Sequence, residues 1–182
     1  MIQNDTLRSI LERSSIRAYK PTPLTDEEIE TLKAAALAAP TGMNLRELRF
    51  KFVTDASVVG QINEVLFDNM DDAQRERLRT RGTDSVFYHA PLVVFITAEP
   101  SYWAEVDAGI AVQNLALTAQ SMGLSSVILG MPRVAFEGDG SDVSRTLLKM
   151  TPRERFIIAI GIGHADTEKQ PHEGDPSHIL DV

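Results

Sequence analysis

With 182 residues, of which 43% are hydrophobic, the chain is long enough to bury one core and too short for two, so we expect a single domain over residues 1–182. Its net charge of -8 argues against nucleic-acid partners, which require a positively charged surface. The absence of cysteine excludes a disulfide, a thiolate nucleophile and a cysteine-bound iron–sulfur cluster.

Two helices are predicted before the first strand. Apolar residues recur at helical spacing over residues 5–13, which indicates a short first helix. Thr25 and Glu28 form a capping-box pattern that opens a second helix, and Pro40 ends it. The opening residues have neither the positively charged n-region nor the uninterrupted apolar h-region of a signal peptide, so we expect a cytoplasmic protein.

The next part of the chain predicts a strand followed by two polar helices. Alternating apolar residues over 48–53 indicate the strand, and a polar helix is expected over about 56–67. Residues 68–83 are rich in arginine and in acidic residues at helical spacing, which is typical of a solvated helix. A mobile cover over a binding site is the alternative interpretation of this charged stretch.

The longest apolar region predicts the centre of the core. Residues 92–96 form a continuous apolar run, which is typical of a strand buried on both faces. Residues 103–122 carry small and apolar side chains on one helix face and Val106 and Ile110 on the other, so we expect a helix buried nearly all round. A membrane span is the competing interpretation, but polar residues such as Asp107 interrupt the run and favour a water-soluble core.

The C-terminal third predicts the remaining elements of the core. Gly123 is a predicted helix C-cap, and residues 124–129 form a second buried strand. A loop is expected over 130–141, then a helix around 143–148, a last core strand over 156–162 and an extended tail. Helices and strands interleave unevenly, with two helices before the first strand, which favours an α+β fold over a regular βαβ array.

Common catalytic motifs are missing from this chain. The glycines at 161 and 163 lack the third glycine and the following helix of a dinucleotide-binding motif. The four histidines lack the close spacing of common zinc sites, so no metal is expected. No nucleophile and base pair stands out, and we assign no catalytic side chain. This pattern fits either a binding protein or an enzyme whose cofactor brings the reactivity.

Basic residues are unevenly distributed along the chain. No lysine or arginine occurs between Arg81 and Arg133, so the middle of the chain is expected to be interior. Cations lie instead near the start of the chain, at Arg8, Arg13, Arg17 and Lys20. We therefore expect this opening segment to hold any bound anion.

Five segments of the chain are informative together. They are ERSSIRAYK (12–20), PTPLTDEEIETLKAAALAAPTGMN (21–44), FYHAPLVVFITA (87–98), VDAGIAVQNLALTAQSMGLSSVILG (106–130) and RFIIAIGIGHAD (155–166). In this order they resemble the nitroreductase family of FMN-dependent oxidoreductases. The resemblance covers nearly the whole chain and implies a mixed, mostly antiparallel central sheet flanked by helices. It also implies a homodimer that binds FMN at the subunit interface.

The resemblance places the flavin phosphate at the opening segment. Arg13 and Arg17 supply planar guanidinium donors for a phosphate. Ser14 and Ser15 add hydroxyl and backbone donors. A surface salt bridge is the alternative role for each arginine.

The sequence departs from the family pattern at two places. After the PTGMN loop, Arg46 and Glu47 stand where family members commonly have glutamine and proline. Near the C-terminus, Lys169 and His172 occupy the place of the family's basic pair for the phosphate. Because a histidine is only partly charged at neutral pH, we expect a weaker phosphate clamp than usual.

The resemblance assigns further flavin contacts to two other segments. The loop after the second helix is expected to contact the flavin of the other subunit through Pro40, Thr41, Gly42, Met43 and Asn44. Leu129 and Gly130 are expected beside the isoalloxazine ring. Without the resemblance, the first segment is a helix-ending loop, and the second is a strand end where glycine serves the turn.

The resemblance implies hydride transfer from NADH or NADPH through FMN to a nitroaromatic, quinone or related acceptor. One alternative is a reduced-flavin enzyme of another type, such as a dehalogenase or a flavin-degrading enzyme. The other is a non-catalytic, dimeric flavin-binding or regulatory protein, which the altered Arg46, Glu47 and His172 favour. Candidate substrate contacts, with packing as their alternative role, are Tyr88, His89, Trp103 and Phe136.

Overall fold

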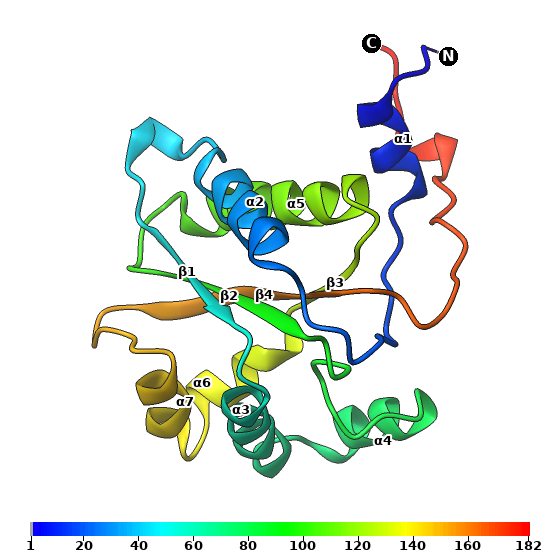
Figure 1. Ribbon diagram of the computed structural model, residues 1–182. Helices are drawn as coiled ribbons and strands as arrows, with labels where there is room; N and C mark the ends of the chain where they lie inside the picture. Colours follow the sequence, from blue (N-terminus) through cyan, green and yellow to red (C-terminus); the bar gives the residue numbers. More distant parts are fainter. Residues whose placement is uncertain (1) are drawn as a thin grey trace.

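The computed structural model describes residues 2–182 and has a four-stranded sheet with helices on both faces (Figure 1). The strand order is β1-β2-β4-β3, and each neighbouring pair is antiparallel. The strands are β1 (Leu48–Val53), β2 (Leu92–Ala98), β3 (Ser125–Leu129) and β4 (Arg155–Gly163). The α+β fold expected from the sequence is therefore confirmed.

Strand β2 lies inside the sheet, and all of its residues are buried. Val93 and Phe95 pack into the core on one face, whereas Val94 and Ile96 pack into the core on the other. Successive side chains of a strand point to opposite faces, so a strand covered on both faces is apolar at every position. The continuous apolar run had predicted this burial.

One face of the sheet is covered by α2 (Asp26–Leu37) and α5 (Ala104–Ser121), with α1 (Asp5–Glu12) beside α5 (Figure 1). The predicted capping box opens α2. Thr25 Oγ1 accepts from the Glu28 N–H at 3.2 Å, and the Glu28 carboxylate accepts from the Thr25 N–H at 2.7 Å. Helix α5 ends before Gly123, whose φ of +76° is the left-handed conformation of a glycine C-cap.

Helix α5 is not buried nearly all round, so that expectation was wrong. Ala108, Ala111 and Leu115 are fully buried, but Val106 is 54% exposed and Ile110 is 37% exposed. Apolar residues around a whole helix do not distinguish a core helix from one whose second face remains open to another surface. Across residues 2–182, no helix has the length and apolar character needed to span a bilayer.

The opposite face of the sheet is covered by α3 (Ala56–Asp68), α6 (Val134–Glu137) and α7 (Ser141–Leu147), with α4 (Asp72–Thr80) to one side (Figure 1). Helix α3 was expected to be polar, but Ile62 and Leu66 are completely buried. Ile62 and Leu66 are four residues apart and therefore share the face of α3 that packs into the core, while Glu64 between them is exposed. Helix α4 is solvated as predicted, and its single large apolar residue, Leu78, packs into the core.

The predicted loop over 130–141 contains short helices instead. The 3-10 helix η2 (Met131–Arg133) leads directly into α6. Phe136 of α6 stacks on Phe156 with ring centroids 4.9 Å apart, so this candidate for substrate contact is a core residue. Aromatic packing therefore orders a segment whose proline and glycines predicted a loop.

Two other irregular segments contain single 3-10 turns. The PTGMN loop includes η1 (Gly42–Asn44), and the tail beyond β4 includes η3 (Pro176–His178). The rest of the tail is extended, as predicted, and returns toward α1 (Figure 1). The tail therefore lies on the same side of the molecule as the opening segment.

Candidate functional site

Residues 15–19 pair with β3 and with the segment after β4. The Ile16 N–H donates to the Ser126 carbonyl at 3.0 Å, and the Ile16 side chain is buried. The Tyr19 hydroxyl donates to the Ile16 carbonyl at 2.8 Å. Burial raises the pKa of Tyr19, so its hydroxyl remains a proton donor. These anchors hold the segment against the sheet and leave Arg17, between two buried residues, exposed.

Arg17 lines a cavity of about 120 Å³ at the end of β3. The guanidinium carbon of Arg17 lies 5.9 Å from the centroid of the Tyr88 ring. Arg81 Nη1 donates to the Tyr88 hydroxyl at 2.7 Å, and Leu129 and Gly130 also line the cavity. No acidic side chain of the described chain lines it. Two guanidinium groups therefore make this cavity attractive to an anion.

Tyr88 is held in a strained backbone conformation. Tyr88 and His89 have φ values of +53° and +54°, in the left-handed region that residues with a Cβ rarely adopt. Such strain persists only where the surrounding structure fixes it, and here Phe87 and Tyr88 are buried. Sequence reasoning had not assigned Arg81 to the site. The available signal was its position as the last cation before a long stretch without lysine or arginine.

The structure brings several predicted contacts together. Arg17, Leu129 and Gly130 line the same cavity. Ser14 Oγ donates to the carbonyl oxygen of Lys169 at 3.2 Å, which places the C-terminal segment beside the opening one. These five residues come from three distant parts of the chain. Their proximity makes this end of the sheet the strongest candidate for a ligand site.

The remaining residues of the expected phosphate site lie on the same two segments. Arg13 is the half-buried C-cap of α1. Ser15 forms a β-bridge with Ser126, whose buried Oγ has no hydrogen-bond partner within residues 2–182. His172 lies on the tail and is exposed. The Ser126 hydroxyl is therefore a buried polar group beside Ser15 of the opening segment, without a partner among residues 2–182.

The loop over residues 40–44 lies away from this cavity in the same chain. Figure 1 shows η1, in cyan, at the opposite end of the α2 and α5 layer from the dark blue opening segment. The Gly42 N–H donates to the carboxylate of Asp107, and the Trp103 ring lies against Gly42. Met43 is 84% exposed. A single chain therefore does not join the two parts of the expected flavin site.

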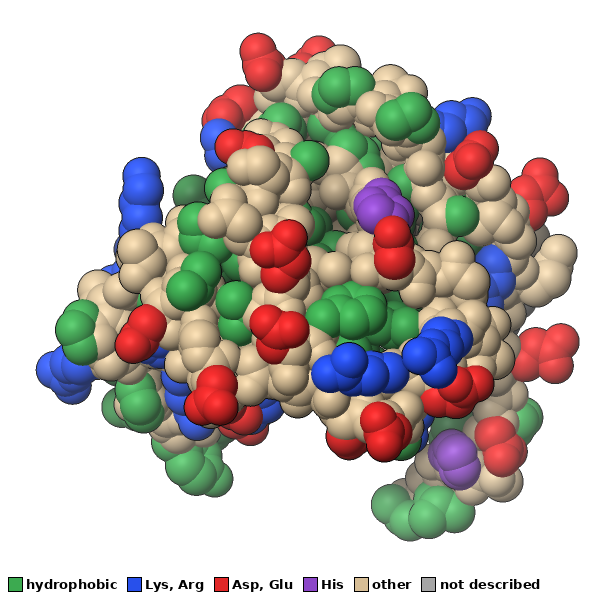
Figure 2. Space-filling model, turned by 90° about the horizontal axis from the view of Figure 1, so that it is seen from below, with side chains coloured by type: hydrophobic (Ala, Val, Ile, Leu, Met, Phe, Trp, Pro, Cys, Tyr) green, Lys and Arg blue, Asp and Glu red, His purple; other side chains and the backbone are tan. Residues whose placement is uncertain are grey.

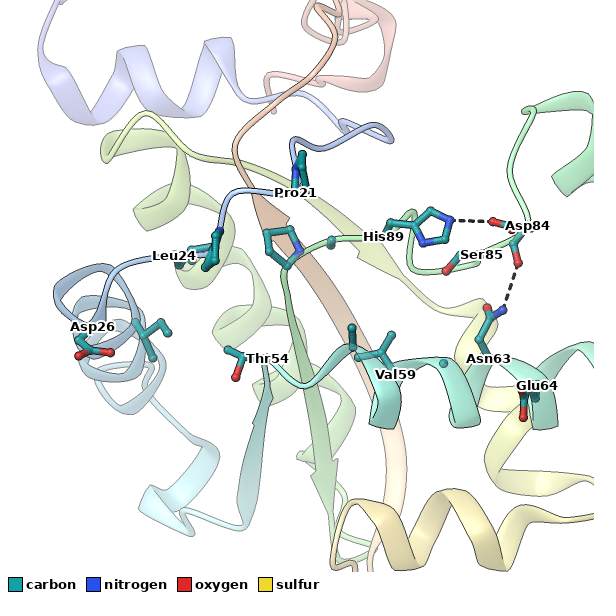
Figure 3. Close-up of a pocket in the computed structure, with 16 residues that line it drawn as sticks. Pro21, Leu24, Asp26, Thr54, Val59, Asn63, Glu64, Asp84, Ser85 and His89 are labelled. Carbon is teal, nitrogen blue, oxygen red and sulfur yellow. Dashed lines mark hydrogen bonds and ion pairs between the residues drawn. The ribbon is translucent and has the colours of Figure 1, made fainter.

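A larger groove of about 740 Å³ opens beside α2 and α3 (Figure 3). Its charged lining includes Asp26, Glu64, Asp84 and His89, and Figure 2 shows acidic side chains around a hollow with an apolar base. His89 Nε2 lies 2.7 Å from Asp84 Oδ1, and this hydrogen bond lowers the pKa of Asp84. Three carboxylates repel a phosphate, so the smaller cavity beside Arg17 is the better anion site.

Known families and solved structures resemble this chain over most of its length. The profile of the Nitroreductase family matches residues 10–164. A nitroreductase from Desulfitobacterium hafniense DCB-2, solved with bound FMN, has a TM-score of 0.92 and 30% identity, with 100% of both chains covered. An FMN-bound nitroreductase from Bacteroides fragilis NCTC 9343 has a TM-score of 0.88 and 25% identity, over 99% of this chain and 100% of its own.

A curated relative extends the similarity to a named enzyme. The NADPH-flavin oxidoreductase of Vibrio harveyi is 28% identical over 97% of this chain and 72% of its own length. The family profile spans both the opening segment and all four strands. On this evidence the chain belongs to the nitroreductase family.

Proposed function

We propose that this chain is an FMN-dependent oxidoreductase that takes hydride from NADH or NADPH and reduces a nitroaromatic, quinone or related acceptor. The observation that carries the proposal is the cavity beside β3, where Arg17, Arg81 and Tyr88 meet Leu129 and Gly130. Family membership and the FMN-bound structural relatives support the same cofactor. The activity named for the Vibrio harveyi relative supports a nicotinamide donor.

The donor set of the opening segment suits the phosphate of FMN. That phosphate carries about two negative charges near neutral pH, so a chain of net charge -8 needs local cations to hold it. Guanidinium groups and hydroxyls are strong phosphate donors. We assign the phosphate contacts to Arg13, Ser14, Ser15, Arg17, Lys169 and His172.

When bound, FMN supplies the ring that accepts hydride and passes electrons to the acceptor. The chain itself supplies binding, orientation and charge. Arg17 and Arg81 place two positive charges at the cavity, where they would attract the negative charge of the bound cofactor. Gly130 leaves its backbone open, because nothing lies within 4 Å of the position that a Cβ would occupy. We assign proton transfer to no side chain.

We assign the second half of the site to a second copy of the chain. The C-terminal end of α2, the loop over residues 40–44 and the N-terminal half of α5 with its N-cap carry exposed apolar side chains: Leu37, Met43, Trp103, Val106 and Ile110. Several large apolar side chains exposed on neighbouring elements suit a subunit interface. In a homodimer, Pro40, Thr41, Gly42, Met43 and Asn44 of one chain can then contact the flavin held by the other.

Flavin uptake and reduction test this proposal. Protein incubated with FMN and desalted should be yellow, and NADPH or NADH should bleach it without oxygen until a nitroaromatic or quinone restores the colour. Yellow protein that no nicotinamide bleaches would indicate a reduced-flavin enzyme of another type. In that case the flavin is first reduced with dithionite, and a halogenated phenol that then restores the colour would reveal a dehalogenase. Protein that stays colourless because it binds no FMN would contradict the proposal. Sedimentation velocity should give the mass of two chains.

A further inference from the structure

We propose that Asp107 is a positioning residue that holds the loop over residues 41–46 from the buried side of α5. This inference rests on the proposed function, in which that loop meets the flavin bound by a second copy. Asp107 is 2% exposed, so it acts through the loop. It sets the conformation of residues that are themselves placed to touch the flavin.

The carboxylate of Asp107 binds one backbone group of the loop. The Gly42 N–H donates to Oδ1 at 3.0 Å and to Oδ2 at 2.9 Å. Asp107 takes part in none of the ion pairs of residues 2–182. It lies in the first turn of α5, where the positive end of the helix dipole favours a negative charge. A buried charge without a cation depends strongly on the polar partners it has, and Gly42 is one of them.

Trp103 closes the other side of the same glycine. A Cβ on Gly42 would lie 2.5 Å from Trp103 Cγ, so only glycine leaves room for the indole ring. Trp103 in turn packs edge-on against Tyr102, with ring centroids 4.8 Å apart. Gly42 is therefore clamped between an indole and a carboxylate, and both come from the N-terminal end of α5.

Beyond the clamp, the loop is already formed in the isolated chain. Met43, Asn44 and Arg46 have φ values of +52°, +57° and +53°, all left-handed. The Arg46 N–H donates to Thr41 Oγ1 at 3.2 Å, and Arg46 Nε donates to Asn44 Oδ1 at 2.8 Å. Three unfavourable backbone conformations in four residues require support from outside the loop. The clamp at Gly42 supplies that support and presents the exposed Met43 at the loop tip.

Losing the carboxylate should loosen the loop and leave the rest of the fold in place. The buried face of α5 is made chiefly of alanine, valine and leucine, which pack without Asp107. Asp107→Ala removes the acceptor of the Gly42 N–H, so the cost of the substitution falls on the loop. The effect is therefore expected in flavin retention and in the motion of the loop.

The test compares Asp107→Ala with Glu105→Gln, which removes an exposed carboxylate from the same helical turn. For Asp107→Ala, we expect the Kd for FMN to rise about tenfold, as for the loss of one charged hydrogen bond, whereas the control stays within about twofold. Asp107→Asn keeps one acceptor oxygen, so its Kd for FMN should lie between those of Asp107→Ala and the control. In flavin-free protein, hydrogen exchange should show an unprotected Gly42 amide in Asp107→Ala alone.

A second variant tests the clamp with Asp107 intact. The Cβ added by Gly42→Ala pushes the loop away from Trp103, so it should raise the Kd in the same direction. If Asp107→Ala binds FMN with a Kd within about twofold of wild type and its Gly42 amide exchanges at the wild-type rate, the role of Asp107 is overturned. If Asp107→Ala loses both FMN binding and the dimer, the role of Asp107 is also overturned, because the substitution then acts on subunit assembly. Wild-type protein that takes up no FMN would overturn the proposed function itself.

Discussion

Replacing Arg17 by alanine tests the proposed phosphate contact directly. Within residues 2–182 the guanidinium donates one weak hydrogen bond, at 3.4 Å to the Ser15 carbonyl, and lies over the Tyr88 ring in a cation–π contact. Losing this contact should cost the flavin-free fold only about 0.5–1 kcal/mol. Losing a hydrogen bond to a charged phosphate costs about 1.5–3 kcal/mol, which is about a tenfold to 150-fold increase in the Kd for FMN.

Flavin fluorescence titration at fixed ionic strength measures this Kd, and urea unfolding of the flavin-free protein measures the structural cost. Arg17→Lys keeps the charge without the planar fork and should give an intermediate Kd. Arg153→Ala is the control: it also removes one positive charge, but from the turn that precedes the first residue of β4, and it should leave the Kd unchanged. Added salt should narrow the difference between wild type and Arg17→Ala. An unchanged Kd for Arg17→Ala would refute the reasoning.

Three further substitutions test the interface, the core and a helix end. Ile110→Lys charges the open face of α5 and should give folded single chains in sedimentation velocity; a persistent dimer would contradict the interface. Burial alone would raise the pKa of Glu154, but hydrogen bonds from Thr97 and Thr151 and the Lys51 ion pair outweigh it and hold the pKa below its usual value. The ionised Glu154 therefore adds to the free energy of unfolding above about pH 4.3, and this contribution is lost as the pH falls through the lower pKa of the folded protein. In urea unfolding, the free energy of unfolding should fall less steeply with acid for Glu154→Gln than for wild type. The same pH dependence in both proteins would count against this role of Glu154. Gly123→Ala imposes a left-handed φ of +76° on alanine and should lower the free energy of unfolding by about 1 kcal/mol, whereas Gly60→Ala inside α3 should raise it.

Local patterns predicted most of the secondary structure. Thr25 and Glu28 placed the start of α2, the apolar run over 92–96 placed β2, and Gly123 placed the end of α5. Each of these signals involves residues within one helical turn or one strand, so it can be read directly along the chain. The loop predicted over 130–141 was wrong because its order comes from Phe136 packing on Phe156, which no local pattern shows.

The amino-acid sequence by itself determined most of the elements, their order and the resemblance that pointed to Arg17, Leu129 and Gly130. Tertiary structure alone decided that Arg81 and Tyr88 join them, because the end of α4 and the turn before β2 pack beside the opening segment. It likewise decided which face of α5 stays open and joined Gly42 to a carboxylate 65 residues away. These outcomes depend on how distant segments pack together. The sequence pattern cannot show them, because apolar residues recur at the same helical spacing whether the helix face is buried in a core or left open.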